Sequence, residues 1–249
     1  MKTLVLPALL LLSPSVVLAQ GLTAREIVQK ADDKARGFTS QSEMTMTIVR
    51  PEWSRSVSMK AWSKGTDYAL ILITAPVKDK GQVFLKLRNE MWNWVPSIDK
   101  MIKIPPSMMM QSWMGSDFTN DDLVQQSSIV KDYTHSLLGK EAVRGKECYK
   151  IGLIPLPDAD VVWGKIVMWI TVYGFHEWRS EFYDEDMELV TAEEASVLKW
   201  MGDREVPTHM EMMPVKKKGN KTILEILTIR FDLPLDDAIF SQQNMKKVR

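Results

Sequence analysis

Residues 43–49 read EMTMTIV, and apolar side chains alternate there with polar ones. Met44, Met46 and Ile48 are placed to face one way, while the acidic and threonine side chains between them face the other. This period of two is the pattern of a half-buried β-strand. The same alternation recurs along most of the chain that follows, so the sequence predicts a mainly β protein.

The remaining strand candidates follow one another with short turns between them. Turn signals at 64–66 (KGT), 184–186 (DED) and 218–220 (KGN) predict that neighbouring strands pair as hairpins. So many short strands without a Pro/Gly/Ser linker or an internal repeat predict one barrel or one strongly curved sheet. We expect these strands at 56–62, 67–74, 82–88, 91–95, 129–136, 147–154, 165–173, 178–183, 188–200, 205–213 and 222–231.

One of these strands requires cover on both of its faces. In KIVMWITVY (165–173), Ile166, Met168 and Ile170 share one face, while Val167 and Trp169 are on the other. A sheet that is solvated on one side alternates more cleanly, so a helix is expected against one face of this strand. The chain offers a helix at 22–36, with helical spacing of apolar residues, a threonine N-cap and a glycine stop.

The first residues have the pattern of a secretory signal peptide. Lys2 precedes an apolar run from Leu4 to Leu12, and small or aliphatic residues follow at Val17 and Ala19. The run is shorter than the roughly 20 residues of a membrane span, which favours cleavage after Ala19 over an uncleaved anchor. We therefore predict export, with residues 20–249 as the mature chain and a single domain.

Charge and cysteine content narrow the classes of function. The chain has 32 basic and 32 acidic residues, so it lacks the basic surplus that nucleic-acid binding requires. Its single cysteine, Cys148, excludes an internal disulfide and lies too far from the cleavage point to carry a lipid anchor. We interpret Cys148 as a core residue.

Residues 91–114 read MWNWVPSIDKMIKIPPSMMMQSWM and concentrate methionine and tryptophan. Flexible thioethers and broad indole rings line surfaces that accept apolar partners of variable shape. We expect a short helix from Ser107, as N-cap, to Gly115, and a second one capped by Thr119 with Asp122 three residues on. The sequence leaves two interpretations equally open, a plug that fills the mouth of the sheet and an apolar binding site.

The same stretch carries a family resemblance. MWNWVPSIDKMIKIPPSMM and QSWMGSDFTNDDLV, together with RPEWSR (50–55), KDKGQVFLKL (78–87), EWRSEFYDEDMEL (177–189) and Phe240, resemble a bacterial family of outer-membrane lipoprotein-sorting proteins, which are similar to the periplasmic lipoprotein carrier LolA. The resemblance covers most of the mature chain. It implies an incomplete antiparallel β-barrel, here of about 11 strands, closed by a helical lid.

The resemblance also implies a function. It implies a periplasmic carrier that holds acyl chains of lipoproteins or other lipids in an apolar cavity and moves them between the inner and outer membranes. An inner-membrane transporter, of the ABC or the resistance-nodulation-division type, and an outer-membrane acceptor are the implied partners. An arginine latches the lid of such a carrier, and Arg50 and Arg55 are the candidates here. The residues predicted to form the cavity or lid are Met91, Trp92, Trp94, Met101, Met108, Met109, Met110, Trp113, Met114, Phe118 and Trp169.

Other classes have weaker support. His209, Met210, Met212 and Met213 suggest a periplasmic Cu(I) protein, but alternation on a strand places Met210 and Met212 opposite His209. The three histidines are scattered and no catalytic motif is present, so we expect neither an enzyme nor a cofactor or metal. The acidic residues at 181–188 fit a solvated turn better than a calcium loop. The alternative is a non-carrier accessory or interaction module of a resistance-nodulation-division exporter.

Overall fold

The structure is a computed structural model that describes residues 21–88, 90–124, 128–159 and 161–249, with the side chains of 123 and 124 outside the description. The predicted signal peptide, residues 1–19, lies outside the described residues. Within them, no helix combines the length and the apolar character that crossing a bilayer requires.

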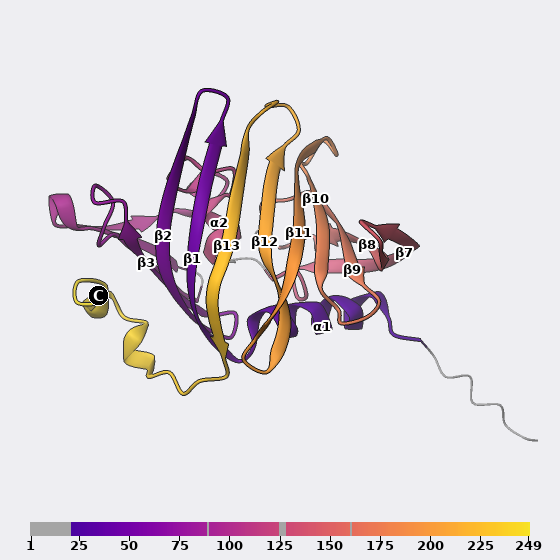
Figure 1. The fold of residues 1–249 in the computed structure, drawn as a ribbon, viewed down its shortest axis with the longest axis horizontal. Helices are drawn as coiled ribbons and strands as arrows, with labels where there is room; N and C mark the ends of the chain where they lie inside the picture. Colours follow the sequence, from indigo (N-terminus) through magenta and orange to yellow (C-terminus); the bar gives the residue numbers. More distant parts are fainter. Residues whose placement is uncertain (1–20, 89, 125–127, 160) are drawn as a thin grey trace, which may run out of the picture.

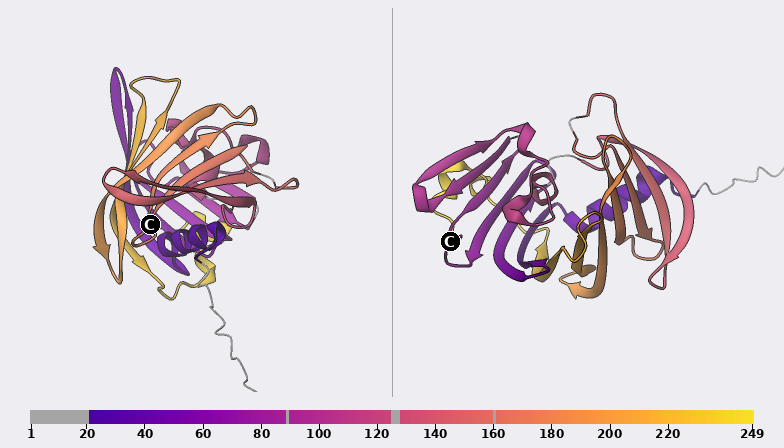
Figure 2. Two further views of the ribbon diagram at one scale, coloured as in Figure 1. Left: turned by 90° about the vertical axis from the view of Figure 1, so that its right-hand side faces the viewer. Right: turned by 90° about the horizontal axis from the view of Figure 1, so that it is seen from above.

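Thirteen antiparallel strands form one open sheet, in the order β6-β5-β4-β3-β2-β1-β13-β12-β11-β10-β9-β8-β7 (Figure 1). The sheet curves into a trough and does not close (Figure 2). The strands are β1 (Thr39–Arg50), β2 (Trp53–Lys64), β3 (Tyr68–Ala75), β4 (Val83–Leu87), β5 (Glu90–Val95), β6 (Lys100–Ile104), β7 (Tyr133–Val143), β8 (Lys146–Pro155), β9 (Lys165–Thr171), β10 (Glu177–Tyr183), β11 (Leu189–Met201), β12 (Arg204–Pro214) and β13 (Lys221–Phe231).

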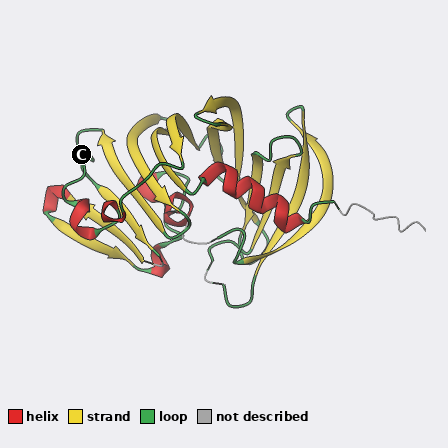
Figure 3. Ribbon diagram, turned by 90° about the horizontal axis from the view of Figure 1, so that it is seen from below, coloured by secondary structure: helices red, strands yellow, loops and turns green. Residues whose placement is uncertain are grey.

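Helix α1 (Ala24–Arg36) lies inside the curve of the sheet (Figure 3). The Thr23 side chain accepts from the Glu26 amide while the Glu26 carboxylate accepts from the Thr23 amide, which is the capping box that the sequence pattern favours. The inner face of α1 packs against β7 and β9. The other helical elements are short: η1 (Pro96–Ile98), η2 (Pro106–Met108), η3 (Trp113–Gly115), α2 (Asn120–Val124), η4 (Asp237–Ile239) and α3 (Gln242–Met245).

The predicted fold class is confirmed, and two of its details are corrected. The sheet has 13 strands, not about 11. The sequence interpretation missed β6, which is a five-residue edge strand inside the methionine-rich stretch. It also placed a strand at 129–136, whereas β7 runs from Tyr133 to Val143. Most of β7 is exposed at the other edge of the sheet, so the alternation expected of a half-buried strand is absent there.

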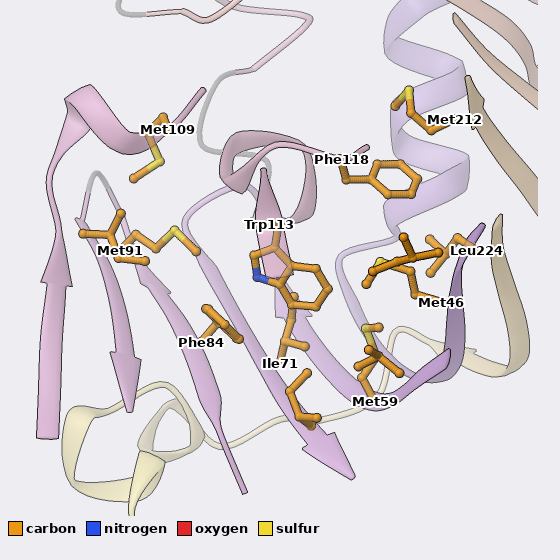
Figure 4. Packing of buried hydrophobic residues seen from close by; sticks show 14 residues of the cluster. Met46, Met59, Ile71, Phe84, Met91, Met109, Trp113, Phe118, Met212 and Leu224 are labelled. Carbon is orange, nitrogen blue, oxygen red and sulfur yellow. The ribbon is translucent and has the colours of Figure 1, made fainter. Parts of the chain in front are cut away.

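The trough contains two separate apolar clusters. The first joins the concave faces of β1–β6, β12 and β13 to residues 105–124, which we call the lid segment (Figure 4). The second joins α1 to the concave faces of β7–β9. Ile166, Met168 and Ile170 belong to this second cluster, so the helix predicted to cover one face of β9 is α1.

The convex side of the sheet is covered in two ways. The C-terminal segment, residues 232–249, lies along the outside of β3–β5, where Phe240 and Met245 pack on Leu70, Leu85 and Trp94. At the other end, the outer face of β8–β10 contains Trp169 and Trp178 beneath the side chains of lysines and arginines. Cys148 is fully buried in this outer layer as a free thiol, as the sequence predicts.

Candidate functional site

The lid segment is a compact loop and not the helix expected from Ser107 to Gly115. Two 3₁₀ turns, η2 and η3, replace that helix, and Met114 adopts a left-handed backbone with φ 51° inside the second. The Trp113 amide donates to the Phe118 carbonyl at 2.8 Å, which folds the loop back on itself. The cap of α2 is confirmed, because the Asp122 amide donates to Thr119 Oγ1 at 3.1 Å and the Asp122 carboxylate accepts from the Thr119 amide at 2.8 Å.

Trp113 anchors the lid segment in the first cluster. Its side chain is 0% exposed and points from the lid segment toward the strands, with its ring 5.1 Å from that of Phe84 between centroids (Figure 4). Met109 and Phe118 are also buried in this cluster. In this conformation the lid segment therefore fills the β1–β5 half of the trough, as the plug interpretation of the sequence describes.

Two arginines from the sheet hold the lid segment by its backbone and by Asp117. Arg50 Nη1 is 2.9 Å from Asp117 Oδ2, and Arg50 Nη2 donates to the Gly115 carbonyl at 3.0 Å. Arg55 Nη2 donates to the Met114 carbonyl. Thr222, from β13, donates its hydroxyl to Asp117 Oδ2 at 2.7 Å and accepts from the Asp117 amide at 2.9 Å. The loop is thus fixed to β1, β2 and β13.

A cavity of about 370 Å³ lies between α1, the lid segment and the concave faces of β9–β13. Ligand pockets in proteins are commonly about 300–1,000 Å³, so the space suits part of a lipid or another small apolar molecule. Most of its walls are apolar. They come from Met44, Phe118, Trp163, Ile166, Met168, Phe182, Ala195, Met210 and Ile226, with Ala31 and Ala35 of α1.

Three carboxyl groups face this apolar cavity from different elements, Asp122 on α2, Glu177 on β10 and Glu193 on β11. Burial raises the pKa of Asp122 to about 6, against the opposing effect of its hydrogen bonds to Thr119. Burial, together with the neighbouring Glu177 and Asp122, raises the pKa of Glu193 to about 8. Burial also raises the pKa of Glu177. Charged carboxylates are costly in such surroundings, so all three favour the protonated form more than usual.

The basic groups at the cavity are held by other partners. Arg36 Nη2 pairs with Asp32 at 2.7 Å. Lys34 Nζ donates to the Gly174 carbonyl at 2.8 Å and is 3.5 Å from His176 Nε2. Glu177 accepts from the Ser180 hydroxyl, whereas Glu193 has no hydrogen bond or ion pair within the described part of the chain.

The predicted site residues divide among four places. Met91, Met109, Trp113, Met114 and Phe118 lie in or against the first cluster, and of all the predicted residues Phe118 alone also lines the cavity. Trp92, Trp94 and Met101 are on the convex side, against the C-terminal segment. Met108 and Met110 are exposed on the lid segment, 37% and 54% respectively. Trp169 is on the convex side of β9, between Lys150 and Arg179.

Sequence reasoning missed most of the cavity lining. Trp163 reaches the cavity from the loop before β9, and Gly164 permits this because a Cβ there would lie 2.4 Å from the Asp184 carbonyl oxygen. Glu193 and Ala195 lie on the same face of β11, where a half-buried strand normally carries larger apolar residues. A carboxyl and a methyl group at two positions where bulky apolar side chains are usual were the signal of a cavity that the sequence offered.

The residues suggested as copper ligands lie on both faces of β12. Met212 is buried in the first cluster, on the concave side. His209 Nε2 is 3.1 Å from Glu211 Oε1 on the other face of β12. The His209 and Met212 side chains therefore point to opposite sides of one sheet.

An open, curved antiparallel sheet around a helix and a lid segment is a LolA-like fold. A family model described as "Uncharacterized protein" matches residues 65–247, and the chain belongs to that family. No curated protein matches it.

Crystal structures place the fold in the same class. A DUF1329 family protein from Desulfovibrio piger superposes with a TM-score of 0.81 at 25% identity, over 89% of this chain and 97% of that one. A putative outer membrane lipoprotein-sorting protein domain from Vibrio parahaemolyticus gives 0.80 at 22%, over 90% and 98%. A LolA superfamily protein from Nitrosomonas europaea gives 0.78 at 22%, over 90% and 100%. The family resemblance stated from the sequence is confirmed.

Proposed function

We propose that this protein is a periplasmic carrier that binds the acyl chain of a lipid or lipoprotein in the cavity between α1 and the sheet. The observation that carries the proposal is a cavity of about 370 Å³ with mainly apolar walls inside a LolA-like fold. Transfer of an acyl chain from water is favourable by about 0.8 kcal/mol per buried methylene, so even part of a chain binds measurably.

The proposal also covers the export and the domain organisation of the chain. Residues 1–19 serve as the cleaved export signal and residues 20–249 form one half-barrel domain. The cargo passes between an inner-membrane transporter and an outer-membrane acceptor. Binding and release, with no chemical reaction, are the activity.

The lid segment is the part proposed to move. Met109, Met114 and Trp113 occupy the half of the trough beside the cavity, and flexible thioethers can leave such a site without breaking hydrogen bonds. Arg50 and Arg55 latch it closed through Asp117, Gly115 and Met114. Opening would join the cavity to the space under the lid and bring the predicted residues Met91, Met109 and Trp113 into contact with cargo.

An apolar fluorescent probe tests the binding claim. N-phenyl-1-naphthylamine should bind the mature protein and be displaced by an acyl-chain lipid. Ala31→Leu, on the wall of the cavity, should weaken this binding, because the added isobutyl group enters the cavity. Ala24→Leu, on the inner face of the same helix but outside the cavity, is the matched control and should bind as the parent does. Equal binding by the two variants, or no binding by the parent, would refute the proposal.

A further inference from the structure

The polar groups that face the cavity bear on the chemistry of the ligand's head. Asp122, Glu177 and Glu193 present carboxyl oxygens, and the cations Lys34 and Arg36 are held by Gly174, His176 and Asp32. Asp32 and Asp121 line the same cavity, so its acidic groups outnumber its basic ones. At a pH above the raised pKa values of Asp122 and Glu193, where these carboxyl groups are ionised, an anionic head would meet like charge here.

A second observation concerns a buried donor. Trp163 is 5% exposed and lines the cavity, yet its Nε1 makes no hydrogen bond of standard geometry within the described residues. The indole N–H lies close enough to the Asp122 carboxyl to help lower that group's pKa. A buried N–H without a full hydrogen bond costs free energy, and a ligand oxygen placed beside it would recover that cost.

We propose that the cavity selects an uncharged amphiphile whose head carries a hydroxyl group. A hydroxyl both donates and accepts, so it can accept from Trp163 Nε1 and donate to the Asp122 or Glu193 carboxylate. Where Asp122 and Glu193 are ionised, a fatty-acid anion can accept from Trp163 but has no proton to give to the carboxylates. This inference rests on the proposed carrier function, because it names the class of lipid that occupies the same cavity.

Two amphiphiles with the same acyl chain test the selection directly. Monolaurin has a glycerol head with free hydroxyls, and laurate has a carboxylate. Displacement of the naphthylamine probe is measured at about pH 8.5, above the pKa of Asp122 and of Glu193. We expect laurate to bind about tenfold more weakly than monolaurin, because like charges brought together are unfavourable.

Two substitutions assign the effect to named groups. Glu193→Gln removes one charge and should strengthen laurate binding, which narrows the difference between the two ligands. Trp163→Phe removes the N–H and keeps an aromatic ring, and it should weaken monolaurin binding severalfold. Trp178→Phe is the matched control, because Trp178 is also 5% exposed with an unpaired Nε1 but lies on the convex side. This substitution should leave the affinity for both ligands unchanged.

The outcomes separate this inference from the carrier proposal. The hydroxyl selection would be overturned, while the carrier function stands, by either of two results. One is that laurate binds as tightly as monolaurin, and the other is that Trp163→Phe leaves the affinity for monolaurin unchanged. Probe binding that neither amphiphile displaces would also overturn the hydroxyl selection, and the carrier proposal would then stand only if a longer acyl-chain lipid displaces the probe. Failure of the probe as well as both amphiphiles would overturn the two proposals together.

Discussion

Arg50 Nη1 lies 2.9 Å from Asp117 Oδ2, and this ion pair joins strand β1 to the loop that carries Trp113. Both side chains are largely buried, 14% and 5% exposed. Asp117 is also bound by Thr222 of β13, so one carboxylate connects the lid segment to two strands. The pair therefore couples the position of the lid segment to the sheet.

Arg50→Ala should loosen the lid segment. It removes the ion pair and the hydrogen bond to Gly115, and among the described residues it leaves the Asp117 carboxylate with the Thr222 hydroxyl alone. We expect the free energy of unfolding to fall by about 3 kcal/mol, as for a broken buried pair. Amide hydrogen exchange at residues 113–118 should accelerate more than amide hydrogen exchange in the strands.

Lys60→Ala is the control for Arg50. Lys60 Nζ and Glu43 Oε1 are 3.9 Å apart, and the two side chains are 38% and 52% exposed. The free energy of unfolding should therefore fall by less than about 1 kcal/mol. Unchanged exchange at residues 113–118 in Arg50→Ala would show that this arginine does not hold the lid segment.

Trp113→Ala should destabilise the protein far more than Met110→Ala. Trp113 is completely buried against Phe84, and its removal leaves a cavity that costs about 3–5 kcal/mol. Met110 is 54% exposed, so its truncation should stay within about 0.5 kcal/mol. Urea unfolding measures both. Similar losses for the two residues would contradict the packing of the lid segment described here.

Stability should depend on the carboxyl groups of the cavity. The pKa of Glu193 is raised to about 8 in the folded protein, so the folded state binds more protons than the unfolded state between the ordinary glutamate pKa, about 4.3, and pH 8. The free energy of unfolding therefore decreases as the pH rises through this window. Asp122, with its pKa raised to about 6, adds to the decrease at the lower end.

Glu193→Gln isolates this effect. The variant should be more stable than the parent at about pH 8, and the difference should shrink as the pH falls and level off below about pH 4, where Glu193 becomes protonated in both states. Thermal unfolding across this range gives the comparison. Glu185→Gln, on the exposed turn after β10, is the control and should follow the parent. A pH profile of Glu193→Gln parallel to that of the parent would refute a cavity-facing carboxyl with a raised pKa.

The sequence predicts the sheet well because alternation is local and strong. The hairpin turns at Gly65 and Gly219 and the double-sided strand at 165–173 could be read directly from residue order. The edge strands were harder, since β6 is short and β7 is mostly exposed. Neither shows the contrast between buried and exposed faces that alternation requires.

The cavity could not be read from the sequence in the same way. Its lining comes from six strands, α1 and the lid segment, and each contributes only a few residues. The tryptophan and methionine content indicated the lid segment, and Trp113 does pack inside the trough. Trp92 and Trp94, however, lie on the convex side of the sheet. Composition identifies an apolar surplus, whereas strand direction decides which side of the sheet receives it.

The most direct test of the carrier is the mass of the protein as a cell makes it. The full chain would be expressed in a Gram-negative host, purified from the periplasmic fraction without detergent, and examined by native mass spectrometry with lipid identification of any adduct. We predict a stoichiometric lipid on the parent protein and on Ala24→Leu, and its loss from Ala31→Leu. A parent protein that carries no lipid and also fails to take up acyl-chain lipids after purification would contradict it.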